Sequence, residues 1–288
     1  MNKQNFPDID PKWGELDPMH NPYVLAHFQA RETDVLITTG PKAGTTWMQQ
    51  ILYQLKSGGD ESFRSIETVV PWLERSRENK TWQELLAYYD RLQNPRIFKT
   101  HCTYPQTPGV DIAKFILTSR DPRDCCVSFY HHMMNLTDSA YQRIGKQRPK
   151  SFDEYFEQWM DFGAWYRNIS SWWPHKEDDN VLWLRYEDLT VDLEQGIDQL
   201  LIFLDWQLAA EYRPRVLEYC SFAWMKNHSE KFSTFDDSQE SYFKPGTFIR
   251  KGQVGDHKNL ITQEQEKRIL DRARQVLPTE CLGFLNII

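Results

Sequence analysis

The sequence is poor in cysteine and has no paired-cysteine motif. Its 288 residues include five cysteines, an odd number, and no two of them form a Cys-x-x-Cys; they are Cys102, Cys125, Cys126, Cys220 and Cys281. A chain of this length can bury a sizeable core without cross-links. We therefore expect reduced, buried thiols and a reducing compartment rather than a disulfide framework.

Long apolar runs are also missing. No stretch approaches the about 18 apolar residues that a membrane-spanning helix needs. The beginning of the sequence carries Asp8, Asp10, Glu15 and Asp17, where a secretory signal would have a basic patch and an apolar run. The sequence therefore predicts no membrane span and a cytoplasmic location.

Positive charge is not in excess. The chain has 34 Lys+Arg against 41 Asp+Glu, a formal net charge of −7. Nucleic-acid binding depends on clustered excess Lys and Arg, so this balance argues against a nucleic-acid partner, although it leaves room for a locally basic pocket. The 11 Trp, 13 Tyr and 16 Phe supply the large rings of a packed interior, which excludes a disordered chain.

Repeats, low-complexity tracts and Gly/Ser-rich or Pro-rich linkers are absent, so we expect one domain over residues 1–288. Short β-branched or aromatic runs alternate with longer stretches of helical period. This alternation is typical of an α/β fold with a central parallel sheet flanked by helices. The expected strands are 35–37, 96–98, 114–118 and 181–186, and the expected helices are 82–92, 122–134, 152–172, 191–204 and 262–276. The apolar side of the fourth helix is expected to comprise Val191, Ile197, Leu200, Leu201 and Leu204.

Residues 229–260 interrupt this alternation. The segment is polar and contains Pro245 and three glycines, at positions 246, 252 and 255. Long loops in compact domains are often lids or binding segments. We expect a mobile lid here that closes over a bound cofactor.

The first strand leads into a glycine loop and then a helix, a P-loop-like arrangement. The loop is Gly40-Pro-Lys-Ala-Gly-Thr-Thr46, and from Trp47 onward apolar residues recur with a helical period. A tight glycine turn, N–H groups at a helix start, two hydroxyls and the Lys42 ammonium all favour a phosphate or sulfate oxygen. The loop departs from the nucleotide-hydrolase pattern G-x-x-x-x-G-K-[ST], because Lys42 precedes Gly44. Taken alone, it also fits an ordinary strand-to-helix turn capped by Thr45.

Five sequence blocks together resemble the cytosolic sulfotransferases. Pro41-Lys-Ala-Gly-Thr-Thr-Trp47 is similar to that family's 5′-phosphosulfate loop, and Lys99-Thr-His101 to its catalytic element. The run from Arg120 to Ser128 is similar to its 3′-phosphate motif. Two further blocks of the family resemble two segments of this chain, Tyr186-Glu-Asp-Leu189 and Arg250-Lys-Gly-Gln-Val-Gly-Asp256. The blocks stand in the family's order and span nearly the whole chain.

The resemblance implies transfer of a sulfuryl group from 3′-phosphoadenosine 5′-phosphosulfate (PAPS) to a small acceptor, with 3′,5′-adenosine bisphosphate (PAP) as product and no metal. His101 would be the general base, since a neutral imidazole with a pKa of about 6.5 can take a hydroxyl proton near neutral pH. Lys42 and Lys99 would stabilise the charge that develops on the leaving phosphate.

The resemblance also implies a set of donor-binding residues. They are Lys42, Ala43, Gly44, Thr45, Thr46, Trp47, Arg120, Ser128, Tyr186, Cys220, Phe222, Arg250, Lys251 and Gly252. Arg120 and Ser128 would hold the 3′-phosphate, over which the 250–252 turn would close. The rings of Trp47 and Phe222 would lie on the two faces of the adenine, with Tyr186 at its edge. Trp47 also begins the apolar face of its helix, so a core position is its alternative.

Four positions depart from the family pattern. Gly40 stands for the usual Tyr, Ala43 for Ser, Cys220 for Thr and His257 for Trp. The change at position 43 removes a hydroxyl thought to interact with the neighbouring lysine, and Cys220 offers only a weak thiol. The family's dimer signature, Lys-x-x-x-Thr-Val-x-x-x-Glu, survives only at Lys258 and Thr262, so monomer and dimer both stay open.

The acceptor pocket is the part that the sequence defines least. We expect its walls within 63–72, 131–141 and 235–248, and a small, apolar acceptor that is a phenol, a sterol, an amine or another alcohol. Two alternatives to an active sulfotransferase stay open. One is a relic that binds PAPS or PAP without turnover, which Ala43 and Cys220 allow. The other is a P-loop nucleotide kinase, which would need a lysine after the second glycine and groups that hold Mg²⁺.

Overall fold

The computed structural model of the protein describes residues 8–77, 79–233 and 241–287. Its centre is a four-stranded parallel sheet with the order β2-β1-β3-β4. The strands are β1 (Val35–Thr38), β2 (Ile97–Thr100), β3 (Lys114–Ser119) and β4 (Val181–Arg185). The first residue of β1, Val35, pairs with Ile97 of β2 and with Lys114 of β3, and Phe115 of β3 pairs with Val181 of β4. The expected α/β class with a central parallel sheet is confirmed.

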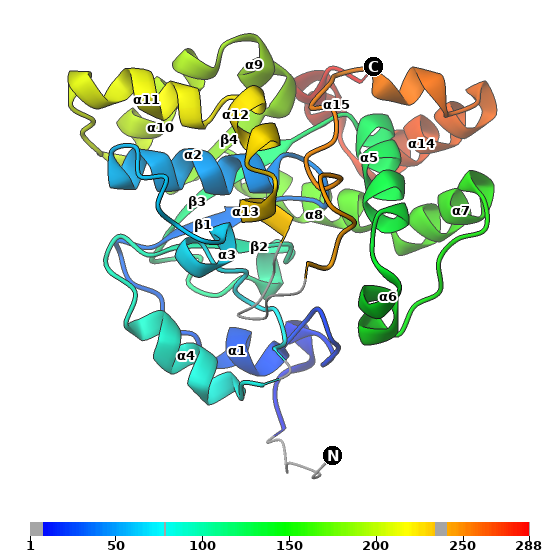
Figure 1. Ribbon diagram of the computed structural model, residues 1–288. Helices are drawn as coiled ribbons and strands as arrows, with labels where there is room; N and C mark the ends of the chain where they lie inside the picture. The colour runs from blue at the N-terminus through cyan, green and yellow to red at the C-terminus, as the bar shows by residue number, and fades with distance from the viewer. Residues whose placement is uncertain (1–7, 78, 234–240, 288) are drawn as a thin grey trace.

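Helices cover both faces of the sheet (Figure 1). Successive strand residues point to opposite faces, so Val35 and Ile37 enter one core while Leu36 enters the other. The apolar runs of the strands therefore need a helical layer on each side. One core includes residues of α2 (Thr45–Ser57), α10 (Leu193–Leu204) and α11 (Arg213–Tyr219). The other includes residues of α5 (Pro122–Met134), α7 (Phe152–Phe162), α8 (Ala164–Trp172) and α14 (Gln263–Val276).

Shorter helices fill the remaining connections. They are α1 (Pro22–His27), α3 (Ile66–Val69), α4 (Trp82–Asp90), α6 (Asp138–Ile144), α9 (Tyr186–Val191), α12 (Phe222–Asn227), α13 (Glu230–Ser233) and α15 (Thr279–Leu285). Of these, only α4 was expected from the sequence. The others span two turns or fewer, which is too short for a helical period to stand out.

Two of the expected helices differ from the structure. The helix expected over 152–172 is divided at Gly163, whose left-handed φ of +56° ends α7 and starts α8. The helix expected over 191–204 begins only after Asp192, whose side chain caps the helix by accepting the backbone N–H of Gln195. Val191 ends α9 instead and is 88% exposed, so its expected place on the apolar side is wrong.

The segment 229–260 has little regular structure in its described part, namely α13 and the 3-10 turn Asp256–Asn259. Residues 234–240 lie outside the described residues, and with them part of the expected lid and of the expected acceptor wall. The role of the segment as a lid stays a prediction.

Two sequence expectations concern thiols and membranes. The five cysteines are free and buried, as expected. Within the described ranges, none of the helices combines the length and the apolar character that crossing a membrane requires.

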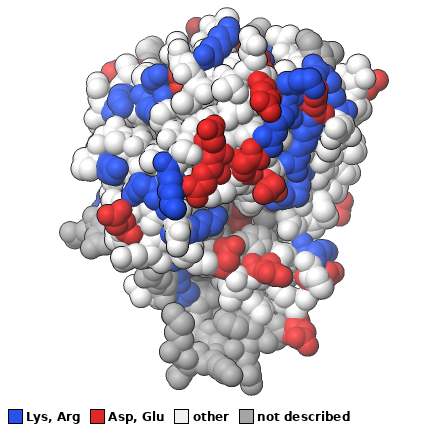
Figure 2. Space-filling view, turned by 90° about the vertical axis from the view of Figure 1, so that its right-hand side faces the viewer, with Lys and Arg blue, Asp and Glu red and all other residues white. Residues whose placement is uncertain are grey.

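The surface charges of opposite sign are interspersed on the face that carries α7 and α14 (Figure 2). Ion pairs join these helices, as between Arg268 and Glu157 at 2.6 Å. This face therefore offers no field of one sign.

Candidate active site

The carboxyl ends of the four strands all open into one cavity of about 1020 Å³. Lys42 lies in the loop after β1, Lys99 in the end of β2, Arg120 directly after β3 and Tyr186 directly after β4. Strand β2 runs two residues beyond its expected end, which places Lys99 inside the sheet. Because β2 and β3 lie on opposite sides of β1, the winding of the chain reverses there, which is where open α/β sheets bind ligands.

The loop between β1 and α2 is a cradle of backbone N–H groups. Gly44 precedes α2 with a φ of +100°, and Lys42 has a left-handed φ of +68°. A Cβ on Gly44 would lie 2.9 Å from Cδ2 of Tyr186, so only glycine fits this close approach. Thr45 is the first helical residue rather than the cap, and its hydroxyl bonds that of Thr39. The first N–H groups of a helix lack partners within it, so those of α2 are available to an anion.

His101 lies directly after β2 and is held in one tautomer. Its Nδ1 is 2.8 Å from the carbonyl oxygen of Thr39. Because a carbonyl only accepts, Nδ1 donates, which leaves the Nε2 lone pair free in the neutral ring. Burial lowers the pKa of His101 and the Lys99 ammonium lowers it further, whereas Glu74 opposes them. The ring is therefore neutral near pH 7 and able to accept a proton.

Lys99 forms a buried ion pair that the sequence did not indicate. Its Nζ lies 2.7 Å from Oε1 of Glu67, with side chains only 5% and 2% exposed. The other carboxylate oxygen of Glu67 accepts the backbone N–H of Trp72 at 3.0 Å. Burial alone would raise the pKa of Glu67, but the Lys99 charge holds it below its ordinary value. The ionised carboxylate thus fixes the lysine against the cavity wall.

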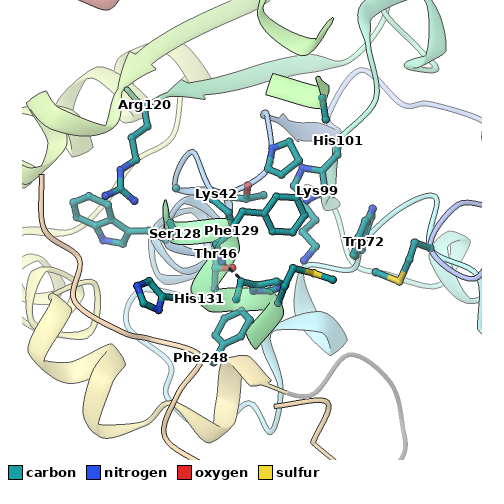
Figure 3. Close-up of a pocket in the computed structure, with 18 of the residues that line it drawn as sticks. Lys42, Thr46, Trp72, Lys99, His101, Arg120, Ser128, Phe129, His131 and Phe248 are labelled. Carbon is teal, nitrogen blue, oxygen red and sulfur yellow. Dashed lines mark hydrogen bonds between the residues drawn. The ribbon is translucent and has the colours of Figure 1, made fainter. Parts of the chain in front are cut away.

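Arg120 is buried on the other side of Lys42 from Trp72 (Figure 3). One of its terminal nitrogens donates to the carbonyl of Gln253 at 2.8 Å, and its guanidinium lies 4.5 Å from the ring centroid of Tyr186. Its buried Nε has no hydrogen-bond partner within the part of the chain that the structure describes. Ser128 lines the same cavity. A buried, unused guanidinium donor suits an anionic oxygen.

Arg250 and Lys251 line the cavity but already have a carboxylate partner. Nη2 of Arg250 is 2.5 Å from Oδ2 of Asp256, and Nζ of Lys251 is 2.8 Å from Oδ1. A phosphate at these cations would have to share them with Asp256.

His257, which stands where the family pattern has Trp, anchors the same segment to α5. Its Nδ1 lies 2.7 Å from Oδ1 of Asp124, and its backbone N–H donates to the same oxygen at 3.0 Å. The N–H of Gly255 donates to the other oxygen at 2.7 Å. Burial alone would raise the pKa of Asp124, but the His257 hydrogen bond and the Arg120 charge lower it to about 2. Polar contacts to Asp124 therefore hold this segment against α5.

Three aromatic rings line the expected adenine position. Trp47 meets Tyr186 edge-on with centroids 5.4 Å apart, and its Nε1 donates to the carbonyl of Cys220 at 2.7 Å. Phe222 is 43% exposed. A Cβ on Gly252 would lie 2.5 Å from Cδ2 of Phe222, so the glycine backbone packs directly on that ring. Trp47 both lines the cavity and packs against the apolar core, and aromatic rings in a cavity wall suit a nucleobase.

Two of the expected donor-binding residues do not line the cavity. The side chains of Ala43 and Cys220 are fully buried, one in each core. The N–H of Ala43 donates to the carbonyl of Gly40 within the loop turn, and burial raises the pKa of the Cys220 thiol. Ser221 and Phe222 line the cavity next to the buried thiol. All the other expected site residues lie in the cavity wall.

The wall near Trp72 and His101 is largely aromatic. The expected segment 63–72 contributes Trp72, whereas Phe63 packs in the core against Tyr53 and Phe232. The expected segments 131–141 and 235–248 contribute His131, His132, Met133, Asn135, Leu136, Tyr242, Phe243, Thr247 and Phe248. Sequence reasoning missed Phe129 and several residues of 14–20, a stretch without any motif.

The cavity holds more positive charge than its own carboxylates balance. Burial, together with the charges of Arg120, Lys99 and Arg250, lowers the pKa of Lys42 to about 7. No carboxylate is among the described groups that act most strongly on Lys42. An anion bound here would favour the charged form of Lys42.

One group of three potential metal ligands occurs among the described residues. A ring nitrogen of His20, a Glu74 oxygen and the Cys102 sulfur lie within 4.8 Å of one another. Nε2 of His20 is 2.6 Å from the carbonyl of Trp13, and Glu74 accepts the N–H of His101 at 3.0 Å. Burial raises the pKa of the Cys102 thiol well above its ordinary value. We assign no metal to this group.

The sequence matches the sulfotransferase domain family over residues 32–278. Human sulfotransferase 1E1 is 32% identical over 268 residues, which cover 89% of this chain and 88% of that protein. Human sulfotransferase 2A1 is 32% identical over 276 residues, covering 89% and 91%. The chain therefore belongs to the sulfotransferase family, as its five blocks indicated.

Solved structures share the fold. Mouse sulfotransferase SULT7A1 complexed with PAP superimposes with a TM-score of 0.71 at 21% identity, covering 93% of each chain. Retinol dehydratase in complex with androsterone and PAP has a TM-score of 0.69 at 22% identity, covering 89% of this chain and 85% of the other.

Proposed function

We propose that this protein transfers a sulfuryl group from PAPS to the hydroxyl or amine of a small, apolar acceptor and releases PAP. The observation that carries the proposal is the convergence of Lys42, Lys99 and His101 on one cavity that also contains the buried cation Arg120. Membership of the sulfotransferase family supports the reaction class.

The cavity fits such a donor. The N–H groups at the start of α2 and the Lys42 ammonium would hold the 5′-phosphosulfate, and the unused Nε of Arg120 would meet the 3′-phosphate. Trp47, Phe222 and Tyr186 would surround the adenine. PAP bound to mouse SULT7A1 and to retinol dehydratase supports this donor class. The donor supplies the sulfuryl group and a phosphate leaving group.

The catalytic groups then have separate tasks. His101 takes the acceptor's proton at Nε2, because Nδ1 is occupied by the Thr39 carbonyl. Lys42 and the loop N–H groups neutralise the charge that grows on the leaving phosphate. Glu67 keeps Lys99 in place beside them.

The aromatic wall beside His101 favours an apolar acceptor. Burial against Trp72, Phe129 and Phe248 would exclude water from the reacting oxygen. Solved neighbours are complexes with androsterone or with retinol, which are apolar alcohols. A sterol, a phenol, another alcohol or an amine would each fit this description.

Three further parts belong to the same proposal. Residues 1–288 form one domain, the 229–260 segment closes over the donor as a lid, and the protein acts in the cytoplasm without a metal. Its five free, buried thiols are consistent with a reducing compartment.

Incubation with ³⁵S-labelled PAPS and a panel of phenols, sterols, alkanols and amines tests the function. We expect labelled product from at least one class and none with His101→Ala. Tight PAP binding with no product from any class would instead indicate a donor-binding relic. Phosphoryl transfer from ATP, with no sulfuryl transfer, would indicate a kinase.

A further inference from the structure

His132 makes a contact with Lys42 that none of the family blocks indicated. Its Nδ1 lies 3.1 Å from Nζ of Lys42. The imidazole lies on α5 among three rings, with centroid distances of 4.7 Å to Phe243, 5.8 Å to Phe129 and 5.9 Å to Phe248. The ring therefore has a fixed place in the cavity wall and one polar contact directed at the lysine.

The direction of this hydrogen bond follows from the charges. Burial lowers the pKa of His132 well below its ordinary value, and the charge of Lys42 lowers it further. The imidazole is therefore neutral at pH 7. A charged ammonium has only donors, so Lys42 donates and Nδ1 of His132 accepts.

Lys42 needs such an acceptor because the cations around it repel it. Arg120 and Lys99 both disfavour its charge. Its four-carbon side chain is flexible, and Ala43 beside it has no hydroxyl. The ring of Phe248, 5.5 Å from Nζ, attracts the cation but does not direct its N–H groups.

We propose that His132 is a positioning residue for sulfuryl transfer: its Nδ1 holds the Lys42 ammonium at the cavity position where charge develops on the leaving group. The proposal rests on the function proposed above. Through Lys42, His132 acts on the rate of transfer more than on donor affinity, since Arg120, the loop N–H groups and the aromatic rings remain to bind the nucleotide.

The contact also sets a pH dependence. A hydrogen bond to a charged ammonium favours the charged form, so His132 supports the protonation of Lys42. The Lys42 charge is fully present at low pH and is lost as pH rises through the Lys42 pKa, about 7 without donor, so this charge sets the high-pH limb of activity. The titratable and charged groups that face Lys42 or His132 are Lys99 and His101 at β2, Arg120 at β3, Cys125 on α5 and Arg250 in the 229–260 segment.

Three substitutions separate the acceptor atom from the ring. His132→Asn keeps an acceptor near the position of Nδ1 without a ring, His132→Phe keeps a ring without an acceptor, and His132→Leu has neither. We expect the Phe and Leu variants to lose about ten- to hundredfold in kcat, the range for one hydrogen bond to a charged group, with little change in the KM for PAPS. The high-pH limb of their kcat/KM profiles should move to lower pH. His132→Asn should stay close to the parent in both readouts.

His175→Phe is the matched control. His175 lies outside the cavity, and its ring stacks on Tyr104. This change should leave kcat, KM and the pH profile at parent values. Parent-like kcat and pH profile in the Phe variant would overturn the proposal, as would equal defects in the Asn and Leu variants, which would assign the effect to ring packing. If the Phe variant does not fold, the comparison of the Asn variant with the Leu variant decides.

A parent protein without transfer activity would defeat the proposed function instead. PAP titration in buffers of different ionisation enthalpy would then still show whether the Leu variant changes proton uptake by Lys42.

Discussion

Replacing Arg120 by alanine should change ligand selectivity more than general binding. Arg120 is 7% exposed and has an unused Nε donor, while one terminal nitrogen bonds Gln253. If the guanidinium holds the 3′-phosphate, Arg120→Ala removes charge-assisted hydrogen bonds that PAP has and 5′-AMP lacks. Their loss is about 2–3 kcal/mol, which corresponds to about 30- to 150-fold in Kd.

The ratio of the two dissociation constants is the informative quantity. Arg120→Ala also removes the contacts with Gln253 and Tyr186, which loosens the site for both nucleotides. This common loss cancels when the Kd of PAP is divided by that of 5′-AMP. Isothermal titration of both nucleotides into parent and variant therefore isolates the 3′-phosphate.

Arg123→Ala is the matched control for this experiment. Arg123 is only three residues away, but it pairs with Asp121 and Glu266 and does not line the cavity. Its loss should leave the PAP to 5′-AMP ratio at the parent value even if stability falls. The assignment of Arg120 would be refuted if Arg120→Ala weakened PAP and 5′-AMP binding by the same factor. It would also be refuted if Arg123→Ala changed the ratio of the two dissociation constants as much as Arg120→Ala does.

Three other changes test the remaining machinery. His101→Ala should abolish sulfuryl transfer and leave PAP affinity nearly intact, because Nε2 acts on the acceptor; turnover at the parent rate would remove His101 from the mechanism. Glu67→Gln should lower kcat by about tenfold and leave the PAP affinity within a few-fold of the parent value, because the buried Lys99–Glu67 ion pair loses its negative partner. An unchanged kcat would show that Lys99 needs no carboxylate. Gly252→Ala should weaken PAP binding by about five- to thirtyfold, because Gly252 has a φ of +61° and the new Cβ would displace the Phe222 ring. An unchanged PAP affinity in titration would mean that this ring does not contact the adenine.

The sequence predicted the parts of the site that depend on local order. The β-branched run before Gly40 and the helical period after Trp47 define a strand, a loop and a helix whatever the rest of the chain does. The strand ends then had to lie along one edge of the sheet, because parallel strands place their carboxyl ends together.

The contacts that orient the catalytic lysines could not be predicted in this way. Glu67 meets Lys99 only because α3 packs near the end of β2, and His132 meets Lys42 from a helix that begins two strands later. Neither partner stands in a local pattern. Cys220 is a different case: its position along the chain resembles a ligand contact, but its thiol lies in the core after α11, and Ser221 and Phe222 line the cavity. Its role in donor binding stays a prediction.

The charge distribution connects the acidic composition with an anionic donor. The net charge of −7 is a property of the whole chain, and opposite charges are interspersed on the face that carries α7 and α14 (Figure 2). Lys42, Lys99 and Arg120 instead point into the cavity, where burial removes the water that would screen them. Screening in salt acts over about 8–10 Å, so these cations attract the donor mainly at short range. Affinity should therefore come from the few placed cations rather than from steering by the whole protein, and a negative net charge is compatible with a strongly anion-binding site.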